Sequence, residues 1–259
     1  MICARPISKR ASRLATALLM AVLPVTPLLA TNHAEETSPE FQQYRSAKAA
    51  YENQPRNAQA AWQFGRACFD MRRSGATKAQ RADIAQEGIA ACRNALATET
   101  NSAPLRYYLG LNLGALAETR GLSALKLVNQ MEQELLTAAA LDPRFDYAGA
   151  DRTLGMLYRD APTIISVGSR AKARQHLLRA VQLLPNFLDN RFELIHALIK
   201  WNERHAARKQ LEALEESWTE ARSEFSGPAW EPAWRTWEAQ LQKLRKELEE
   251  PAKLPSPRG

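Results

Sequence analysis

The chain has 259 residues, with 35 lysines and arginines against 28 aspartates and glutamates, so its formal net charge is +7. Four basic residues, Arg5, Lys9, Arg10 and Arg13, lie in the first 30 positions, and the remaining 229 residues carry only +3. A charge this small gives no basis for binding nucleic acid. Hydrophobic residues make up 45% of the sequence, which is enough for a buried core.

The N-terminal segment has the pattern of an export signal. Its basic start is followed by an apolar stretch from Leu14 to Ala30, which is short for a membrane span and is interrupted by Pro24 and Pro27. We expect residues 1–30 to be a signal peptide, cleaved after Ala30 or Ala34, and the protein to be periplasmic or exported. An uncleaved N-terminal anchor is the alternative, and membrane contact is expected only in that case. No cysteine directly follows the apolar stretch, so lipidation is not expected.

Few segments alternate with period two, so the fold class is predicted to be all-α. Residues 31–57 are expected to contain one N-terminal helix, from Pro39 to Asn53. Residues 58–218 are expected to form a helical repeat domain of about four hairpins. The helices of the first two are predicted near 58–72, 78–97, 103–113 and 124–141. The third hairpin is predicted to begin near Gly149 and to stop at Pro185, and the fourth to include residues 194–198 and 207–214.

A recurring spacing identifies the type of repeat. Pro55 is followed after ten residues by Gly65, and Pro143 after twelve by Gly155, each small residue lying inside the next predicted helix. Such residues let two helices approach closely. The pattern resembles the tetratricopeptide family, which implies an α-solenoid. Gly65, Gly110 and Gly155 are 45 residues apart, whereas a standard repeat has ~34. The additional residues are expected in loops at 73–77, 119–123 and 161–169, and such additions often decorate a binding edge.

The C-terminal region differs from the repeats. After the break at Gly227-Pro228, Trp230, Trp234 and Trp237 follow a helical spacing that continues into Leu241, Leu244 and Leu248. We interpret residues 229–250 as a C-terminal helix that caps the open end of the solenoid. A tryptophan stripe exposed for a partner helix is the alternative. Residues 251–259 are expected to be disordered.

Cys68 and Cys92 are the two cysteines that remain after the expected signal peptide, and in an exported protein such a pair suggests a disulfide. A register that places Gly65 opposite Gly88 separates the two sulfurs by ~10 Å along the helix axis. We therefore favour two buried free thiols, and leave the bridged form open.

The segment from Tyr147 to Pro162 carries a more specific likeness. Its residues from Gly149 onward match the core G-x-D-R-x-L-G-x-L-Y-x-x-A-P, and the glycine-containing loop Ser166–Ser169 follows. This segment resembles the T-component family of tripartite ATP-independent periplasmic (TRAP) transporters. A weaker likeness, through the same inserted loop, is to the microtubule-dynamics regulator family. The first resemblance implies a periplasmic repeat protein that associates with a solute-binding subunit and carries a small apolar ligand. The lipid-acceptor cysteine of many such proteins is missing here.

The sequence shows no catalytic, cofactor or metal-binding motif. The four histidines are His33, His176, His196 and His205. His176 and His196 lie on separate predicted helices with no cysteine or carboxylate at ligand spacing, and neither H-E-x-x-H nor a phosphate-binding glycine loop occurs. We therefore expect no enzyme activity, no cofactor and no metal. Asp151 and Arg152 are expected to pair locally.

A binding groove is the functional prediction. The first helix of each hairpin lines the concave side of this fold, which predicts a groove of aromatic and arginine side chains, the types enriched in binding hot spots. Three arginines among them are expected to clamp a carboxylate. For Trp62, Tyr107 and Phe192, packing between repeats is an equal alternative. The predicted ligand- or partner-binding residues are Trp62, Arg66, Phe69, Tyr107, Leu111, Arg152, Tyr158, Arg159, Phe192 and His196.

These observations predict a non-enzymatic exported repeat protein that binds a protein partner, in the manner of a TRAP T-component with its solute-binding subunit. A general protein–protein scaffold of an envelope or secretion complex is the alternative function.

Overall fold

The computed structural model describes residues 38–73, 77–121 and 123–249, so the expected signal peptide and the expected disordered tail, residues 251–259, lie outside the described residues. All regular structure within the described ranges is helical. The elements in chain order are α2 (Pro39–Asn53), α3 (Ala58–Asp70), a 3₁₀ turn η1 (Met71–Arg73), α4 (Lys78–Leu96), α5 (Ala103–Glu118), α6 (Ala124–Leu141), α7 (Phe145–Asp160), α8 (Arg170–Leu183), α9 (Leu188–Lys200), α10 (Arg204–Glu216), α11 (Trp218–Glu224) and α12 (Glu231–Glu249).

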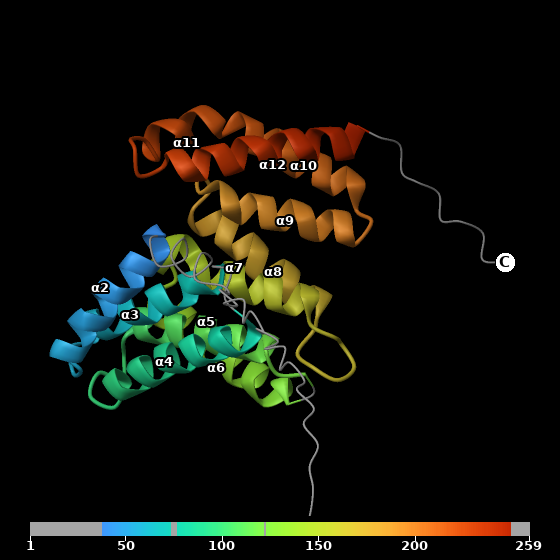
Figure 1. The fold of residues 1–259 in the computed structure, drawn as a ribbon. Coiled ribbons are helices and arrows are strands. Elements are labelled where there is room, and N and C mark those ends of the chain that lie inside the picture. Colours follow the sequence, from blue (N-terminus) through green and yellow to red (C-terminus); the bar gives the residue numbers. More distant parts are fainter. Residues whose placement is uncertain (1–37, 74–76, 122, 250–259) are drawn as a thin grey trace, which may run out of the picture.

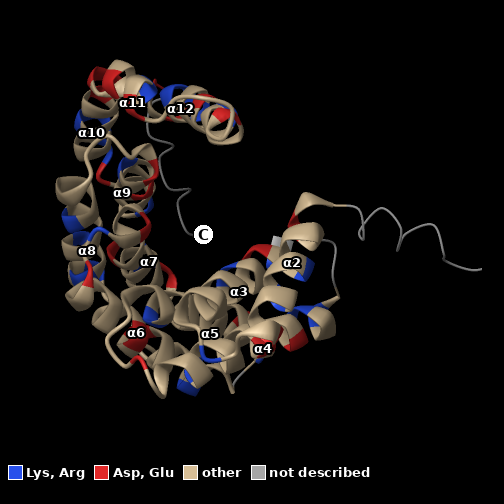
Figure 2. Ribbon diagram, turned by 90° about the vertical axis from the view of Figure 1, so that its left-hand side faces the viewer, with Lys and Arg blue, Asp and Glu red and all other residues tan. Residues whose placement is uncertain are grey.

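The helices pair into four antiparallel hairpins: α3 with α4, α5 with α6, α7 with α8 and α9 with α10 (Figure 1). The first helices of successive hairpins also contact one another, from α3 through α5 and α7 to α9. Helix α2 covers α3 at one end, and α12 covers α9 and α10 at the other. Figure 2 shows the resulting curved row, with α7 and α9 on its inner side and α8 and α10 outside. The predicted all-α, tetratricopeptide-like solenoid with a capping C-terminal helix is confirmed.

Glycines at the helix contacts allow the close approach that the repeat needs. A Cβ atom on Gly65 would lie 2.6 Å from the Sγ of Cys92, and one on Gly88 would lie 2.8 Å from the side chain of Asn112. The expected register, with Gly65 opposite Gly88, is therefore wrong: Gly65 of α3 packs on the small thiol of α4, and the amide from α5 fills the space beside Gly88. Cys68 and Cys92 are both buried and free, as favoured from the sequence.

Helix α12 buries its tryptophan stripe. Trp234 and Trp237 are almost completely buried, and Trp230 is half-buried. The indole nitrogen of Trp234 donates to the carbonyl of Phe225 at 2.6 Å, and that of Trp237 donates to the carboxylate of Asp189 at 2.7 Å. Each buried indole N–H thus has a partner, as a stable core requires. The stripe belongs to the core of the C-terminal end rather than to a free surface.

Candidate partner-binding surface

Helix α3 presents the accessible part of the predicted groove. Trp62, Arg66 and Phe69 are four and three residues apart, so they lie along one side of the helix. Trp62 is half-buried and stacks on Tyr108 of α5, with ring centroids 5.8 Å apart. The ring of Phe69 is also half-buried, and the guanidinium of the neighbouring Arg72 lies 3.7 Å from its centroid. We call Trp62, Arg66 and Phe69 the α3 stripe.

Arg66 is the charged centre of the α3 stripe. Its side chain is 51% exposed, and its Nε lies 3.7 Å from the carboxylate of Asp70, one turn further along the same helix. An exposed ion pair of this length contributes little, on the order of 0–1 kcal/mol. The guanidinium of Arg66 therefore loses little free energy when it leaves Asp70 and binds another carboxylate.

An open cleft of about 810 Å³ continues from Trp62 along the edge where α3 and α5 begin. Its wall combines the indole of Trp62 and the guanidinium of Arg56 with amide, hydroxyl and carboxyl groups. Such a wall offers hydrogen bonds to a polypeptide backbone and an apolar platform for one side chain. The lining residues are Arg56, Asn57, Ala58, Gln59, Trp62, Glu99, Asn101, Ser102, Ala103, Pro104, Leu141 and Asp142.

The start of α7 contains a turn of left-handed backbone. Asp146, Tyr147 and Ala148 have φ values of 50°, 57° and 60°, although none of them is glycine. This conformation costs about 1–2 kcal/mol per residue, so neighbouring groups must hold it. The hydroxyl of Tyr107 donates to the Asp146 carboxylate at 2.8 Å. The regular right-handed part of α7 consequently begins close to Gly149, although the helix as a whole starts at Phe145.

Arg152 is used to hold this left-handed turn. Its guanidinium donates to the Tyr147 carbonyl at 3.0 Å and to Oδ1 of the buried Asn190, on α9, at 2.8 Å. The amide nitrogen of Asn190 in turn donates to the Tyr147 carbonyl at 3.2 Å. The side chain of Arg152 is only 15% exposed. It is therefore a positioning group between two repeats rather than a free clamp for a ligand.

Asp151 and Arg152 do not pair, so the expected local ion pair is wrong. Consecutive residues on a helix point about 100° apart, and Asp151 turns toward α8. There its buried carboxylate contacts Nδ1 of His176 at 2.7 Å and the guanidinium of Arg179 at 3.3 Å. The two halves of the motif thus join α7 to different neighbours.

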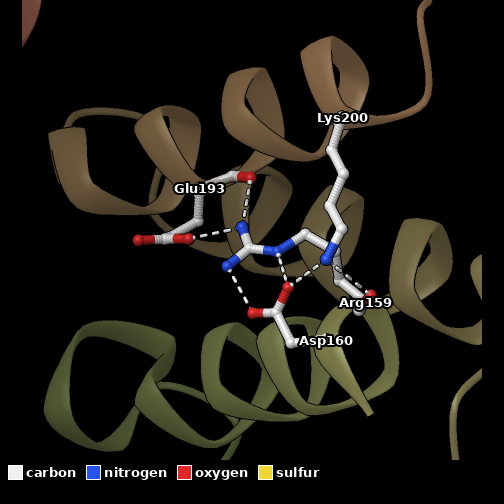
Figure 3. Close-up of polar contacts among 4 residues, drawn as sticks. All are labelled: Arg159, Asp160, Glu193 and Lys200. Atoms are coloured by element: carbon white, nitrogen blue, oxygen red, sulfur yellow. Dashed lines mark hydrogen bonds and ion pairs between the residues drawn. The ribbon is translucent and has the colours of Figure 1, made fainter. Parts of the chain in front are cut away.

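Arg159 is enclosed by a network of charges between α7 and α9 (Figure 3). Its guanidinium donates to Glu193 at 2.7 Å and to Asp160 at 2.8 and 3.0 Å. The ammonium of Lys200 also donates to Asp160, at 2.8 Å. Although partial burial acts in the opposite direction, hydrogen bonds from the two cations hold the pKa of Asp160 below its ordinary value. Both carboxylates that Arg159 binds come from the protein itself.

His196 is half-buried on α9 near this network. Burial lowers its pKa, while the nearby Glu193 acts in the opposite direction. Its ring is therefore disposed to be neutral at pH 7.

The other predicted groove residues lie in the interior. Tyr107, Tyr158, Phe192 and Leu111 are all buried, and the hydroxyl of Tyr158 donates to Glu132 of α6 at 2.6 Å. Tyr107 and Phe192 therefore pack between repeats, which was the alternative to a binding role for both residues. Of the ten predicted residues, only the α3 stripe is brought together as an accessible surface.

The sequence did not single out several residues of this region. Asn190 and the left-handed residues have no motif, and the absence of glycine at 146–148 conceals the turn. The cleft residues at the starts of α3 and α5 follow short loops, and because binding residues are often found on loops, this position could have indicated them.

Across the described parts of the chain, no group of three metal-ligating side chains occurs. No helix in those same ranges combines the length and hydropathy that crossing a membrane requires.

A solved structure of a tetratricopeptide protein resembles this one. TTC0263, a thermophilic tetratricopeptide protein from Thermus thermophilus, superposes with a TM-score of 0.60 at 13% identity, covering 84% of this chain and 96% of that one. MamA gives a TM-score of 0.49 at 17% identity, covering 73% and 98%. At such identities the first likeness shows the fold alone. A search among curated proteins finds no match.

One family is shown by the sequence itself. Its model, described as Regulator of microtubule dynamics protein 1-3, matches residues 28–224, which span the expected N-terminal helix and all four hairpins. This is the family to which the sequence showed the weaker of its two specific likenesses, through the loop between α7 and α8. The chain belongs to the regulator of microtubule dynamics protein 1-3 family.

Proposed function

We propose that this chain is a non-enzymatic binding protein that holds a segment of a partner protein against the α3 stripe and the cleft beside it. One observation carries the proposal: of the three arginines predicted to clamp a carboxylate, Arg66 alone keeps an accessible guanidinium. Arg152 is bound to Asn190, and Arg159 is bound to Glu193. Arg66 lies between two half-exposed aromatic rings, the residue types that dominate binding energy at protein interfaces.

The chemistry of the stripe indicates what it binds. A guanidinium forms two parallel hydrogen bonds with a carboxylate, and flanking aromatic rings cover apolar side chains. The amides and hydroxyl group of the cleft suit an extended backbone that continues past Trp62. The segment we propose therefore carries an aspartate, a glutamate or a free C-terminus next to an apolar residue.

Site-specific photo-crosslinking tests this assignment. A photo-reactive residue at the exposed position Gln63, beside the stripe, is compared with one at Arg93, which is exposed on α4. We expect a crosslinked partner from position 63 only. A peptide made from that partner should then bind at least about tenfold more weakly to Arg66→Ala or Trp62→Ala, because each removes a hot-spot side chain. Equal crosslinking from both positions, or unchanged affinity of both variants, would show that the stripe is not the site.

The narrower form of the proposal places the protein in the periplasm, with a solute-binding subunit as its partner. It is supported by the basic, then apolar, N-terminal sequence and by the T-component-like core from Gly149 to Pro162. The general scaffold of an envelope complex is the broader form. Native mass spectrometry after mild crosslinking in the envelope separates them: a solute-binding protein supports the first, and a component of another envelope complex supports the second.

The family name raises a third partner, the microtubule. An exported protein does not meet tubulin, so the proposed location and this partner exclude each other. Cell fractionation with an antibody, together with co-sedimentation with assembled microtubules, decides between them. Recovery in the periplasm without co-sedimentation supports our proposal, whereas a cytoplasmic protein that sediments with microtubules refutes it.

A further inference from the structure

The loop between α7 and α8 carries the most exposed large apolar side chains in the described part of the chain. Ile164 is 95% exposed and Ile165 is 62% exposed. The loop is tied at its base, because the amide of Gly168 donates to the Pro162 carbonyl at 3.3 Å and the amide of Ser169 donates to the Tyr158 carbonyl at 2.9 Å. Figure 1 shows it extending outward from the edge of the solenoid. The two isoleucines therefore sit at the tip of an anchored projection.

An apolar hollow lies directly beside this projection. Its volume is about 440 Å³, and its wall is mostly aliphatic, from α5, α6, the end of α7 and the loop itself. Ile165 forms part of the wall, as does Leu125, which is 40% exposed. The exposed isoleucines and the hollow thus form one continuous apolar surface. We call the loop from residue 161 to 169 and this hollow the apolar edge.

Four basic side chains lie on the segments that border the apolar edge. Residues 161–169 contain no charged side chain, and Arg170 follows them immediately. Arg170 and Arg174 share a single carboxylate, that of Glu203. Lys126 lies on the adjacent α6, and Arg120 precedes that helix. Among the described residues neither has an ionic partner. Two carboxylates line the hollow itself: Glu118, and Asp160, which is paired with Arg159 and Lys200.

We propose that the apolar edge docks on an anionic lipid bilayer, with Ile164 and Ile165 inserted among the acyl chains and the surrounding cations at the headgroups. Two exposed isoleucines on a projecting, uncharged tip are suited to a bilayer, because a fluid apolar layer needs no complementary pocket. Lysine and arginine side chains near an anionic lipid surface are attracted to it electrostatically. The hollow adjoins the end of α5, whereas the cleft beside Trp62 adjoins its start, so membrane docking leaves the proposed partner site open and does not depend on it.

An environment-sensitive dye at the tip of the loop tests the insertion. In the full chain with Cys3→Ser, the dye is attached to Ile164→Cys. The buried thiols of Cys68 and Cys92 are protected in the folded protein. A matched control carries the dye on Leu141→Cys, at the end of α6 and 40% exposed in the natural chain. The lipids are phosphatidylcholine vesicles with and without about 30% phosphatidylglycerol, which supplies the anionic surface.

The expected result is a blue shift of the dye at 164 with anionic vesicles, weaker with neutral ones, and no shift at 141. Adding Arg120→Glu and Lys126→Glu should abolish most of the shift. Ile164→Ser with Ile165→Ser should weaken vesicle binding at least about tenfold, because two aliphatic side chains lose their apolar contact. The dye reports on the loop whether or not the N-terminal segment also binds lipid.

Three results would overturn the proposal. The first is a protein that sediments with vesicles while the dye at 164 is unchanged, and the second is a protein that binds no vesicles at all. The third is a shift that appears without lipid as the protein concentration rises, which would assign the apolar edge to a contact between two copies of this chain.

Discussion

The contact between α7 and α8 predicts the effect of Gly155→Ala. A Cβ at this position would lie 2.5 Å from Cγ and 3.3 Å from the backbone nitrogen of Leu177. Leu177 is completely buried, so its side chain has no free space to move into and the two helices must separate. Overpacking of this kind costs about 1–3 kcal/mol, and the better helix propensity of alanine returns about 1 kcal/mol. We expect a net loss of up to about 2 kcal/mol in the free energy of unfolding.

Gly114→Ala is the matched control, because it makes the same change on α5, the first helix of another hairpin. Its Cβ would lie 2.8 Å from Sδ of Met131, near the end of a flexible side chain that borders the apolar hollow. The thioether can move, so the propensity gain should leave this variant as stable as the natural chain or up to about 1 kcal/mol more stable. Urea unfolding followed by circular dichroism measures both variants. If Gly155→Ala were no less stable than Gly114→Ala, the close approach of α7 and α8 would not restrict position 155.

Three further measurements test other contacts. Asn190→Ala removes the buried amide that holds the left-handed turn, so urea unfolding should show a loss of at least about 2 kcal/mol; a smaller loss would mean that the turn needs no support from α9. Because the two cations depress the pKa of Asp160, its contribution to stability is present above the ordinary value of 3.8 and is lost as the pH falls through the lower folded value. Asp160→Asn should therefore be less stable than the natural chain at pH 7, with the difference shrinking below pH 3.8, and a difference independent of pH would contradict this. Burial raises the pKa of Cys92 to about 12 and also raises that of Cys68, so neither thiol should react with iodoacetamide at pH 8 until urea is added; fast labelling of either would refute their burial.

The architecture was predictable because it depends on periodic features. Small residues such as Gly65 and Gly155 recur ten to twelve residues after helix-ending prolines, and at both positions they let the helix approach its neighbour closely. Their exact partners were not predictable. Gly65 meets Cys92 rather than Gly88, and no rule of spacing distinguishes two small residues one turn apart on α4.

The left-handed turn shows a second limit of sequence patterns. Positive φ is normally signalled by glycine, whereas Asp146, Tyr147 and Ala148 adopt it because contacts from other repeats hold them there. Those contacts come from Tyr107, 39 residues earlier, and Asn190, 43 residues after Tyr147. Tertiary contacts over such separations leave no local trace in the sequence.

The same kind of contact explains why one predicted arginine is available and two are not. Arg152 and Arg159 lie on α7. They are bound by Asn190 and Glu193 of α9, which is the first helix of the next hairpin. Arg66 lies on α3, and the first helix of the next hairpin is α5. The sequence of α5 from Ala103 to Glu118 contains no carboxylate before its last residue. Because α5 is almost entirely buried and apolar, it has no carboxylate facing Arg66 along the middle of the stripe. The accessibility of the α3 stripe thus follows from the composition of the next repeat.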